Sequence, residues 1–402
     1  MNPKATPPRR LHAALISTTL LLGAVVSGCS TPQPVSSAAV QSFDQAAAQA
    51  ADGLAAQLQA LPEFLSFLET RRVVVLDPMI EAGSGQQTKA TQALQIKVVE
   101  RLRAKHGNAV DIVPFSADNV GKAGYLLTGT ATRKVGVPSS PLKIDLALTD
   151  LGNGKVVAQS SAMARADGVD NTPLMLDQDS PVLAPDKVLE GYARTTVTPP
   201  GQGADPYYLE RVAVSPLIEE AVVFYNAGRY ADALARFESA GKMPGGEQLR
   251  VLSGIYLTLT KTGRTADAEA AFRKIVVYGV ATKQLSVKFL FTPGSTAFWP
   301  DPAVSGPYAM WMGEIAQVST TANICMDVVG HTSRTGSQAV NDALSLDRAK
   351  SIQGQLAAQS AVLGQRTKTS GKGYRENIIG SGSDDLVDSL DRRVEFKVID
   401  CT

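Results

Sequence analysis

The sequence predicts a multidomain α+β protein with an N-terminal α+β domain, a short helical repeat segment and a C-terminal α/β sandwich. A chain of 402 residues is too long for one hydrophobic core, so two or three domains are expected. Strand and helix patterns alternate near both ends of the chain, whereas two similar helical stretches follow each other between them. Apolar residues make up 44% and charged residues 19%, proportions that are ordinary for folded domains.

The first 28 residues have the pattern of a secretory signal, because Lys4, Arg9 and Arg10 precede an apolar run over 11–26. The run ends in Val26-Ser27-Gly28-Cys29, which resembles the bacterial lipobox, in which small residues precede a cysteine that receives lipid. The alternative is an ordinary signal peptide with an incidental cysteine. The resemblance implies a lipoprotein signal over 1–28 and lipidation of Cys29. Because Ser30 rather than aspartate follows, it also implies an outer-membrane lipid anchor with the body of the protein in the periplasm.

The remaining cysteines are Cys325 and Cys401, each beside a predicted strand. Export removes the reducing compartment, so we expect a disulfide between them, with two buried free thiols as the alternative. A disulfide closing so long a loop is expected to contribute about 4 kcal/mol to stability.

The N-terminal α+β domain is expected over residues 43–165, after a Ser/Pro-rich tether at 29–42. A helix is predicted from Phe43 to Leu61 and another after Pro78, with Leu94, Val98 and Leu102 on one face. The strands are predicted at 71–78, 110–115, 125–133, 143–149 and 155–162. The last two form a hairpin through Gly152-Asn153-Gly154. This pattern resembles the N-terminal folds of assembly lipoproteins of the curli-secretion and flagellar kind.

Residues 166–205 contain many Pro, Asp, Thr and Gly residues without sustained periodicity and are interpreted as a linker. An internal repeat follows within residues 206–280: Gly228 to Phe237 aligns with Gly263 to Phe272 at an offset of 35 residues. This offset resembles the tetratricopeptide period. Such helices are either a docking surface for envelope proteins or a spacer, and the sequence favours neither.

Three separated motifs mark the C-terminal region. Val287 to Phe291 alternates as a strand, and Gly330-His331-Thr332-Ser333 leads into a helix that contains Asn341 and Arg348. The closing strand follows Asp391-Arg392-Arg393. In this order the motifs resemble the OmpA-like peptidoglycan-binding domain, over residues 286–402. For Arg392 and Arg393 the alternative to a functional role is that they are solvated ends of the last strand. We interpret His331 as a hydrogen-bonded turn residue rather than a metal ligand.

The resemblance implies a ligand and a site. The ligand of such domains is the peptidoglycan stem peptide, gripped at the zwitterionic end of its diaminopimelate. Arg348 matches the family arginine that pairs with the carboxylate, and Asn341 matches a polar position of the motif. Backbone groups of Thr332 and Ser333 would complete the pocket.

One residue departs from the pattern: Ser333 stands where the family has an aspartate for the ligand ammonium. A neutral hydrogen bond contributes about 1 kcal/mol against about 1.5–3 for a charge-assisted one, so weaker binding is expected. Four other carboxylates are candidates to replace the aspartate: Asp342, Asp347, Asp384 and Asp385. The alternative is a fold that has lost its ligand.

Other function classes lack support in the sequence. A net charge of +1 without a basic cluster disfavours nucleic acid as a partner. The chain has no Gly-x-Ser-x-Gly elbow, Gly83-Ser84-Gly85 lacks the lysine of a P-loop, and Asp384-Asp385 is typical of a solvated loop. No metal site is expected, because the histidines are few and far apart: His12, His106 and His331. We expect no enzyme and no cofactor.

Two functions therefore compete. The first is a lipid-anchored outer-membrane protein that binds peptidoglycan non-covalently and tethers the envelope to the wall. The second is a periplasmic assembly or regulatory lipoprotein that docks partners through its N-terminal and repeat domains, while the C-terminal domain only localises it.

Overall fold

The computed structural model describes residues 1, 35–59, 72–107, 110–133, 140–182, 185–283, 285, 287–378 and 387–401. The described residues from Val35 onward form one compact unit. The predicted signal and Cys29 lie outside the described residues. Within the described part, no helix has the length and apolar character that crossing a membrane requires.

The N-terminal domain is built on a sheet of seven strands. These are β1 (Val35–Gln41), β2 (Arg72–Leu76), β3 (Ile80–Glu81), β4 (Val110–Val113), β5 (Tyr125–Thr132), β6 (Leu142–Asp150) and β7 (Lys155–Ala164). Their order is β1-β7-β6-β5-β2-β4, with β3 paired to β5. The pairs β5–β6 and β6–β7 are antiparallel, whereas β2 runs parallel to both β4 and β5.

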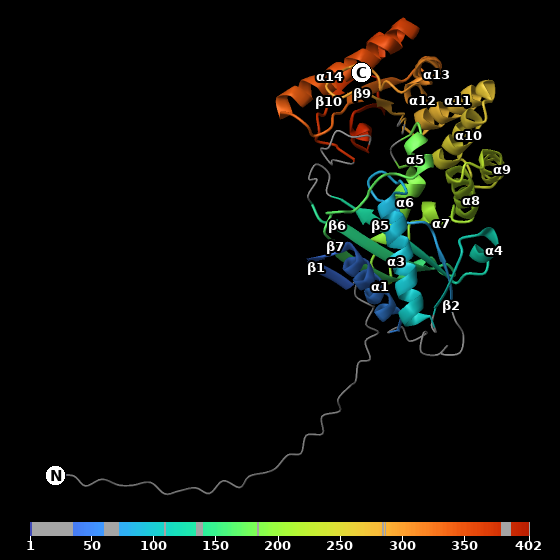
Figure 1. Ribbon diagram of the computed structural model, residues 1–402, viewed down its shortest axis with the longest axis vertical. Helices are drawn as coiled ribbons and strands as arrows, with labels where there is room; N and C mark the ends of the chain where they lie inside the picture. The colour runs from blue at the N-terminus through green and yellow to red at the C-terminus, as the bar shows by residue number, and fades with distance from the viewer. Residues whose placement is uncertain are drawn as a thin grey trace. The chain divides into compact units, whose positions relative to one another are not determined.

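Helices cover both faces of this sheet. On one face, α1 (Phe43–Gln59) and α3 (Lys89–His106) lie side by side and bury Leu94, Val98 and Leu102 against Val74 and its neighbours (Figure 1). The opposite face, which includes Val75, is covered by α6 (Lys187–Thr196) and α7 (Pro206–Leu209). Successive side chains of a strand point to opposite faces, so β2 contributes to both cores. The short helix α4 (Ala117–Val120) follows β4.

Two segments contain more regular structure than predicted. The expected tether holds β1, which pairs in parallel with β7. The expected linker holds α5 (Met175–Asp179) as well as α6. Helix α6 begins at Asp186, whose carboxylate accepts hydrogen bonds from the backbone N–H groups of Val188 and Leu189 at 2.9 and 3.1 Å. Its buried Tyr192 donates to the carbonyl of Gly129 at 3.0 Å, which fixes the helix on the sheet.

The repeat region consists of two helix hairpins, α8–α9 and α10–α11, which lie together in Figure 1. The bounds are Ser215–Asn226, Tyr230–Gly241, Leu249–Lys261 and Thr265–Ala281. Both hairpins turn at a glycine with positive φ, Gly228 at 73° and Gly263 at 72°. The arginine after each glycine forms an ion pair three residues on, to Asp232 and to Asp267, both at 2.7 Å. The sequence repeat therefore recurs as repeated turn geometry.

The C-terminal domain is a four-stranded sheet of order β10-β9-β11-β8. Its strands are β8 (Phe289–Leu290), β9 (Cys325–Gly330), β10 (Thr367–Gly371) and β11 (Arg393–Ile399). Its helices are α12 (Pro302–Ser305), α13 (Tyr308–Thr321), α14 (Gln338–Gln359), α15 (Ala361–Arg366) and the 3₁₀ helix η1 (Val387–Asp391). The pair β9–β10 is parallel, and β11 is antiparallel to both β9 and β8.

The repeat helices and the C-terminal domain share one hydrophobic core. Trp311 of α13 stacks on Phe272 of α11 with ring centroids 5.2 Å apart, and its indole N–H donates to the hydroxyl of Tyr256 at 2.8 Å. Nearby, Arg273 forms an ion pair with Glu314 at 2.6 Å. Two hairpins are few for an isolated solenoid, and here α13 covers the apolar face that they leave.

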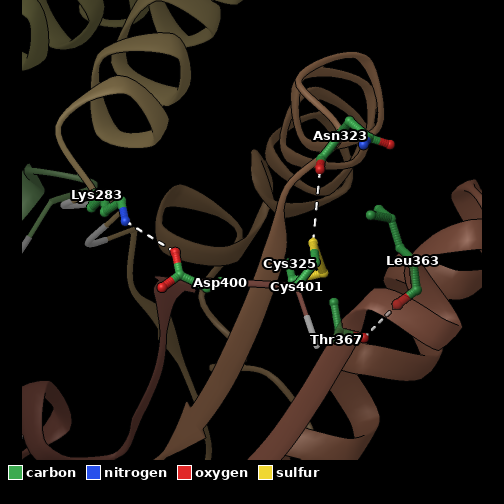
Figure 2. The surroundings of a disulfide bond; sticks show 7 residues. All are labelled: Lys283, Asn323, Cys325, Leu363, Thr367, Asp400 and Cys401. Carbon is green, nitrogen blue, oxygen red and sulfur yellow. Dashed lines mark hydrogen bonds and ion pairs between the residues drawn. A yellow bond between two sulfur atoms is a disulfide. The ribbon is translucent and has the colours of Figure 1, made fainter.

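Cys325 and Cys401 form a disulfide with sulfur atoms 2.09 Å apart (Figure 2). Cys325 opens β9 and pairs in register with Ile399 near the end of β11. Next to the bond, Lys283 forms an ion pair with Asp400 at 3.3 Å, which Figure 2 marks with a dashed line. The disulfide therefore ties the end of the closing strand to the centre of the sheet.

Candidate functional site

The candidate site is the turn from His331 to Ser337, which joins β9 to α14. Its first residues are held by backbone bonds on both sides: His331 N–H donates to the Arg393 carbonyl at 2.8 Å, and Thr332 N–H donates to the Gly373 carbonyl at 2.9 Å. The turn ends at Gly336, whose φ of 92° favours glycine, and at Ser337, which caps α14. Turn and helix therefore begin at a fixed place beside the sheet.

Arg348 projects from α14 into this region and is 0% exposed. Three of its N–H groups donate to backbone carbonyls: Nε to Ser295 at 2.9 Å, Nη1 to His331 at 3.0 Å and Nη2 to Thr292 at 2.9 Å. The guanidinium also lies over the ring of Phe291, 5.1 Å from its centroid. Arg348 thus joins the loop after β8 to the turn after β9 and holds a positive charge between them.

Asn341 holds the second half of the turn. Its Nδ2 donates to the carbonyls of Thr335 and Ser337 at 2.9 and 3.1 Å, and the residue is 3% exposed. These bonds close the chain around Gly336. The sequence predicted Asn341 as a ligand-binding position, and the structure places it as a support of the turn.

Thr332 and Ser333 line the first half of the turn, and both are buried. The hydroxyl of Thr332 has no hydrogen-bond partner among the described residues. The hydroxyl of Ser333 lies 3.3 Å from that of Thr335. The structure therefore gathers all four predicted residues around one turn: Thr332, Ser333, Asn341 and Arg348.

Glycines let α14 approach the ends of β9 and β10 closely. A Cβ on Gly330 would lie 1.8 Å from the carbonyl oxygen of Ser345, and a Cβ on Gly371 would lie 2.6 Å from the Ser345 hydroxyl. That hydroxyl accepts a hydrogen bond from Gly373 N–H at 3.0 Å. Ser345 is therefore the contact point between helix and sheet.

Sequence reasoning missed a buried polar cluster behind the turn. His331 is 0% exposed, and its Nε2 lies 2.9 Å from Oε1 of Glu395, which also lies 3.5 Å from Nη2 of Arg393. Burial alone would raise the pKa of Glu395. Arg393 and His331 outweigh this effect and lower that pKa to about 2. Burial, assisted by Arg393, lowers the pKa of His331.

The same region bears on two expectations from the sequence. Arg392 and Arg393 are 1% and 3% exposed, so they are not solvated strand ends. Arg392 donates to the carbonyl of Phe291 at 3.3 Å. No metal group was expected, yet the fold brings His331, Glu376 and Glu395 together, with potential ligand atoms within 4.8 Å of one another. The Arg393 guanidinium lies beside this group and supplies the positive charge that a cation would bring.

The candidate carboxylates differ in position. Asp342 lies 2.7 Å from Arg375 and beside Gly373, whose carbonyl accepts from the turn. Asp347 is directed to Lys350 at 3.8 Å and is largely exposed. Asp384 and Asp385 lie outside the described residues. Asp342 is therefore the candidate next to the turn among the residues that the structure describes.

Residues 307–387 match the OmpA family. This range contains α13, β9, the turn, α14, α15 and β10, so the C-terminal part of the chain is an OmpA-family domain. No curated protein matches the chain.

Several solved structures resemble part of the chain. The peptidoglycan-associated lipoprotein from Burkholderia pseudomallei is 17% identical, with 29% of this chain and 94% of that chain covered and a TM-score of 0.24. The C-terminal domain of Helicobacter pylori MotB is 20% identical, covering 29% and 85%, also with a TM-score of 0.24. The OmpA-like domain of FopA1 from Francisella tularensis is 18% identical, covering 29% and 75%, with a TM-score of 0.22.

Proposed function

We propose that the OmpA-family domain of this chain binds peptidoglycan non-covalently and that the turn from His331 to Ser337 receives the stem peptide. The observation that carries the proposal is that the family match includes this whole turn together with Asn341 and Arg348. The ligand group is the zwitterionic end of diaminopimelate, which carries one carboxylate and one ammonium.

The carboxylate of the ligand is assigned to the positive charge of Arg348. Because three carbonyls fix the guanidinium, it does not have to reorganise when an anion arrives. A fixed guanidinium in a buried place interacts more strongly with a carboxylate than a solvated one does.

The ammonium of the ligand is assigned to Ser333 and to Asp342. Ser333 offers a neutral oxygen, so binding by this position alone is weak. Asp342 follows Asn341 on α14 and supplies a carboxylate beside Gly373, whose carbonyl accepts a hydrogen bond from Thr332 N–H. Its partner Arg375 is half-exposed, so the ion pair can open towards a ligand.

Tethering completes the proposal. A lipid on Cys29 would hold one end of the chain at the outer membrane while the turn holds the wall. Holding both ends raises the effective concentration of the domain at the wall, so a weak site suffices. No bond is made or broken, and we expect no fragments to be released from peptidoglycan.

Co-sedimentation with purified sacculi tests this function. We expect the purified chain to be retained and the Arg348→Lys variant to be retained about tenfold less, because an ammonium lacks the planar fork of a guanidinium. Arg264→Lys makes the same change at an exposed ion pair of the repeat region and serves as the matched control.

Folding is checked by circular dichroism, since Arg348 also holds three carbonyls in place. Equal retention of a folded Arg348→Lys variant and the wild type would exclude the proposed site. Absence of wild-type retention would exclude the function itself.

A further inference from the structure

A cavity of about 390 Å³ lies between the repeat region and the C-terminal domain, away from the turn. It is bounded by α10 on one side and by α12, α13 and β8 on the other. Its size falls within the range of pockets that hold small organic ligands.

Aromatic rings form much of the wall. Trp299, Tyr308, Trp311 and Tyr256 all line the cavity. The ring of Trp311 packs against those of Tyr308 and Tyr256, with centroids 5.1 and 6.1 Å apart. Leu290 adds an aliphatic surface. A wall of this kind favours an apolar ligand body.

Most of the polar groups at the cavity already have partners. Lys261 forms an ion pair with Asp179 at 2.9 Å, and Asp179 also accepts from the hydroxyl of Tyr225 at 2.7 Å. The Tyr308 hydroxyl accepts from Leu290 N–H at 3.0 Å. These groups are therefore bound within the protein.

Lys288 is the exception. It lines the cavity and is 4% exposed, yet its ammonium makes one long hydrogen bond, to the carbonyl of Gln178 at 3.3 Å. No carboxylate in the described part of the chain forms an ion pair with it. Burial lowers the pKa of Lys288 to about 8, although the nearby carboxylates of Asp177 and Asp179 oppose this shift. The protein therefore compensates the charged ammonium only in part. Buried lysines are normally paired.

We propose that this cavity binds a small organic anion with an apolar body, with Lys288 as its counter-ion and the aromatic rings as its walls. The anionic group of the ligand pairs with the Lys288 ammonium. The apolar part of the ligand packs against the tryptophan rings and displaces water from them. This site is separate from the peptidoglycan site at Arg348 and does not depend on it.

Intrinsic tryptophan fluorescence can report on binding in the cavity, because both tryptophans of the chain, Trp299 and Trp311, line it. The probe is 1-anilinonaphthalene-8-sulfonate, whose fluorescence is excited by energy transfer from nearby tryptophan. Its neutral counterpart is N-phenyl-1-naphthylamine, which has the same ring system without the sulfonate. We expect the purified full chain to bind the anionic probe at least tenfold more tightly than the neutral one.

Variants at two lysines test whether the charge of Lys288 causes the preference for the anionic probe. Lys288→Met keeps the length of the side chain and removes the charge, so we expect the preference for the anionic probe to vanish. Lys288→Arg is expected to restore it. Lys283→Met removes a lysine charge from an exposed ion pair with Asp400 outside the cavity, so it is the control, and we expect it to retain the preference.

The Lys288→Met variant is expected to fold, since it removes a buried charge with few partners. Equal affinity of wild type and a folded Lys288→Met variant for the anionic probe would overturn the proposal. So would binding without energy transfer from tryptophan.

Competition then identifies the chemical source of the anion. Displacement of the probe by decanoate supports an acyl carboxylate, and displacement by indole-3-acetate supports an aryl carboxylate. Displacement by neither compound at millimolar concentration would contradict a carboxylate ligand and overturn the proposal.

Discussion

Ser333 is the residue at which this chain departs from the OmpA-like pattern, and it lies buried at the start of the turn. Its hydroxyl lies 3.3 Å from the hydroxyl of Thr335. Both groups are neutral, so position 333 supplies no negative charge to the turn. The fixed guanidinium of Arg348 is nevertheless kept. At the residue scale, the proposed site therefore retains its cationic half and has a weakened anionic half.

Restoring the aspartate tests this imbalance. We expect Ser333→Asp to increase retention on sacculi about tenfold, because a charge-assisted hydrogen bond to the ligand ammonium replaces a neutral one and adds about 1–2 kcal/mol. Thr335→Asp adds the same charge two residues away on an exposed part of the turn and should change retention little. A gain in both variants, or in neither, would show that position 333 does not contact the ligand.

The sequence predicted which residues gather at the turn but not what they contact. Arg348 and Asn341 were recognised from the motif, and both lie at the turn. Their hydrogen bonds go to backbone carbonyls of Thr292, Ser295 and Thr335, and a carbonyl leaves no mark in the pattern of side chains. The His331–Glu395 contact joins residues far apart in sequence, so no spacing rule could predict it.

At the scale of elements, α14 can lie close to the sheet because glycines without side chains face it. Gly330 and Gly371 bring the strands of β9 and β10 against Ser345, and Gly373 continues this contact. Helix α14 in turn carries Asn341 and Arg348. The distance between helix and sheet therefore determines the shape of the turn.

A methyl group at Gly330 should separate helix and sheet. Its Cβ would lie 1.8 Å from the Ser345 carbonyl oxygen, a backbone atom, so we expect Gly330→Ala to reduce the free energy of unfolding by about 3 kcal/mol or more. Urea denaturation measures this, with retention on sacculi as a second readout.

Gly354→Ala is the control on the same helix, because a Cβ there meets nothing within 4 Å. Alanine is the better helix former, so this variant should be more stable by up to about 1 kcal/mol. A neutral effect of Gly330→Ala would contradict the close contact.

Elements with strong local patterns were predicted, and those without were missed. Helix α3 has Leu94, Val98 and Leu102 four residues apart, and the β6–β7 hairpin has its glycine turn. In contrast, β10 reads Thr-Lys-Thr-Ser-Gly and lies at the edge of the sheet, so it shows no apolar alternation. Helix α6 did carry a signal, the cap at Asp186 followed by Val188, Leu189 and Tyr192, which the surrounding Pro and Thr residues obscured.

At the scale of the whole molecule, two carboxyl groups in different domains make contributions to folding stability that change with pH in opposite directions. Burial raises the pKa of Asp77, at the end of β2, to about 6, although Tyr208 donates to it at 2.6 Å. Glu395 in the C-terminal sheet has its pKa lowered to about 2. In the unfolded chain both groups titrate near pH 4.

The sign follows from which state binds the proton. The folded state holds the Asp77 proton more tightly, so this group's contribution to stability is present below about pH 4 and is lost as pH rises through 6. Glu395 contributes stability above its unfolded pKa of about 4.5, and this contribution is lost as pH falls towards 2.

Urea denaturation across pH 2 to 8 tests both contributions. Relative to wild type, Asp77→Asn should gain stability as pH rises from 4 to 7, by about 3 kcal/mol in total, whereas Glu395→Gln should lose stability as pH rises from 2 to 5. Parallel pH profiles for the two variants would contradict the assigned environments.

The central claim is that the turn beside Arg348 recognises the zwitterionic end of a stem peptide. The most direct measurement is calorimetric titration of the purified chain with a soluble stem peptide that contains diaminopimelate, beside the same peptide with lysine at that position. The two peptides share the ammonium and differ in the carboxylate assigned to Arg348. We predict one binding site for the diaminopimelate peptide and at least tenfold weaker binding of the lysine peptide; equal affinities, or no binding of either, would contradict the claim.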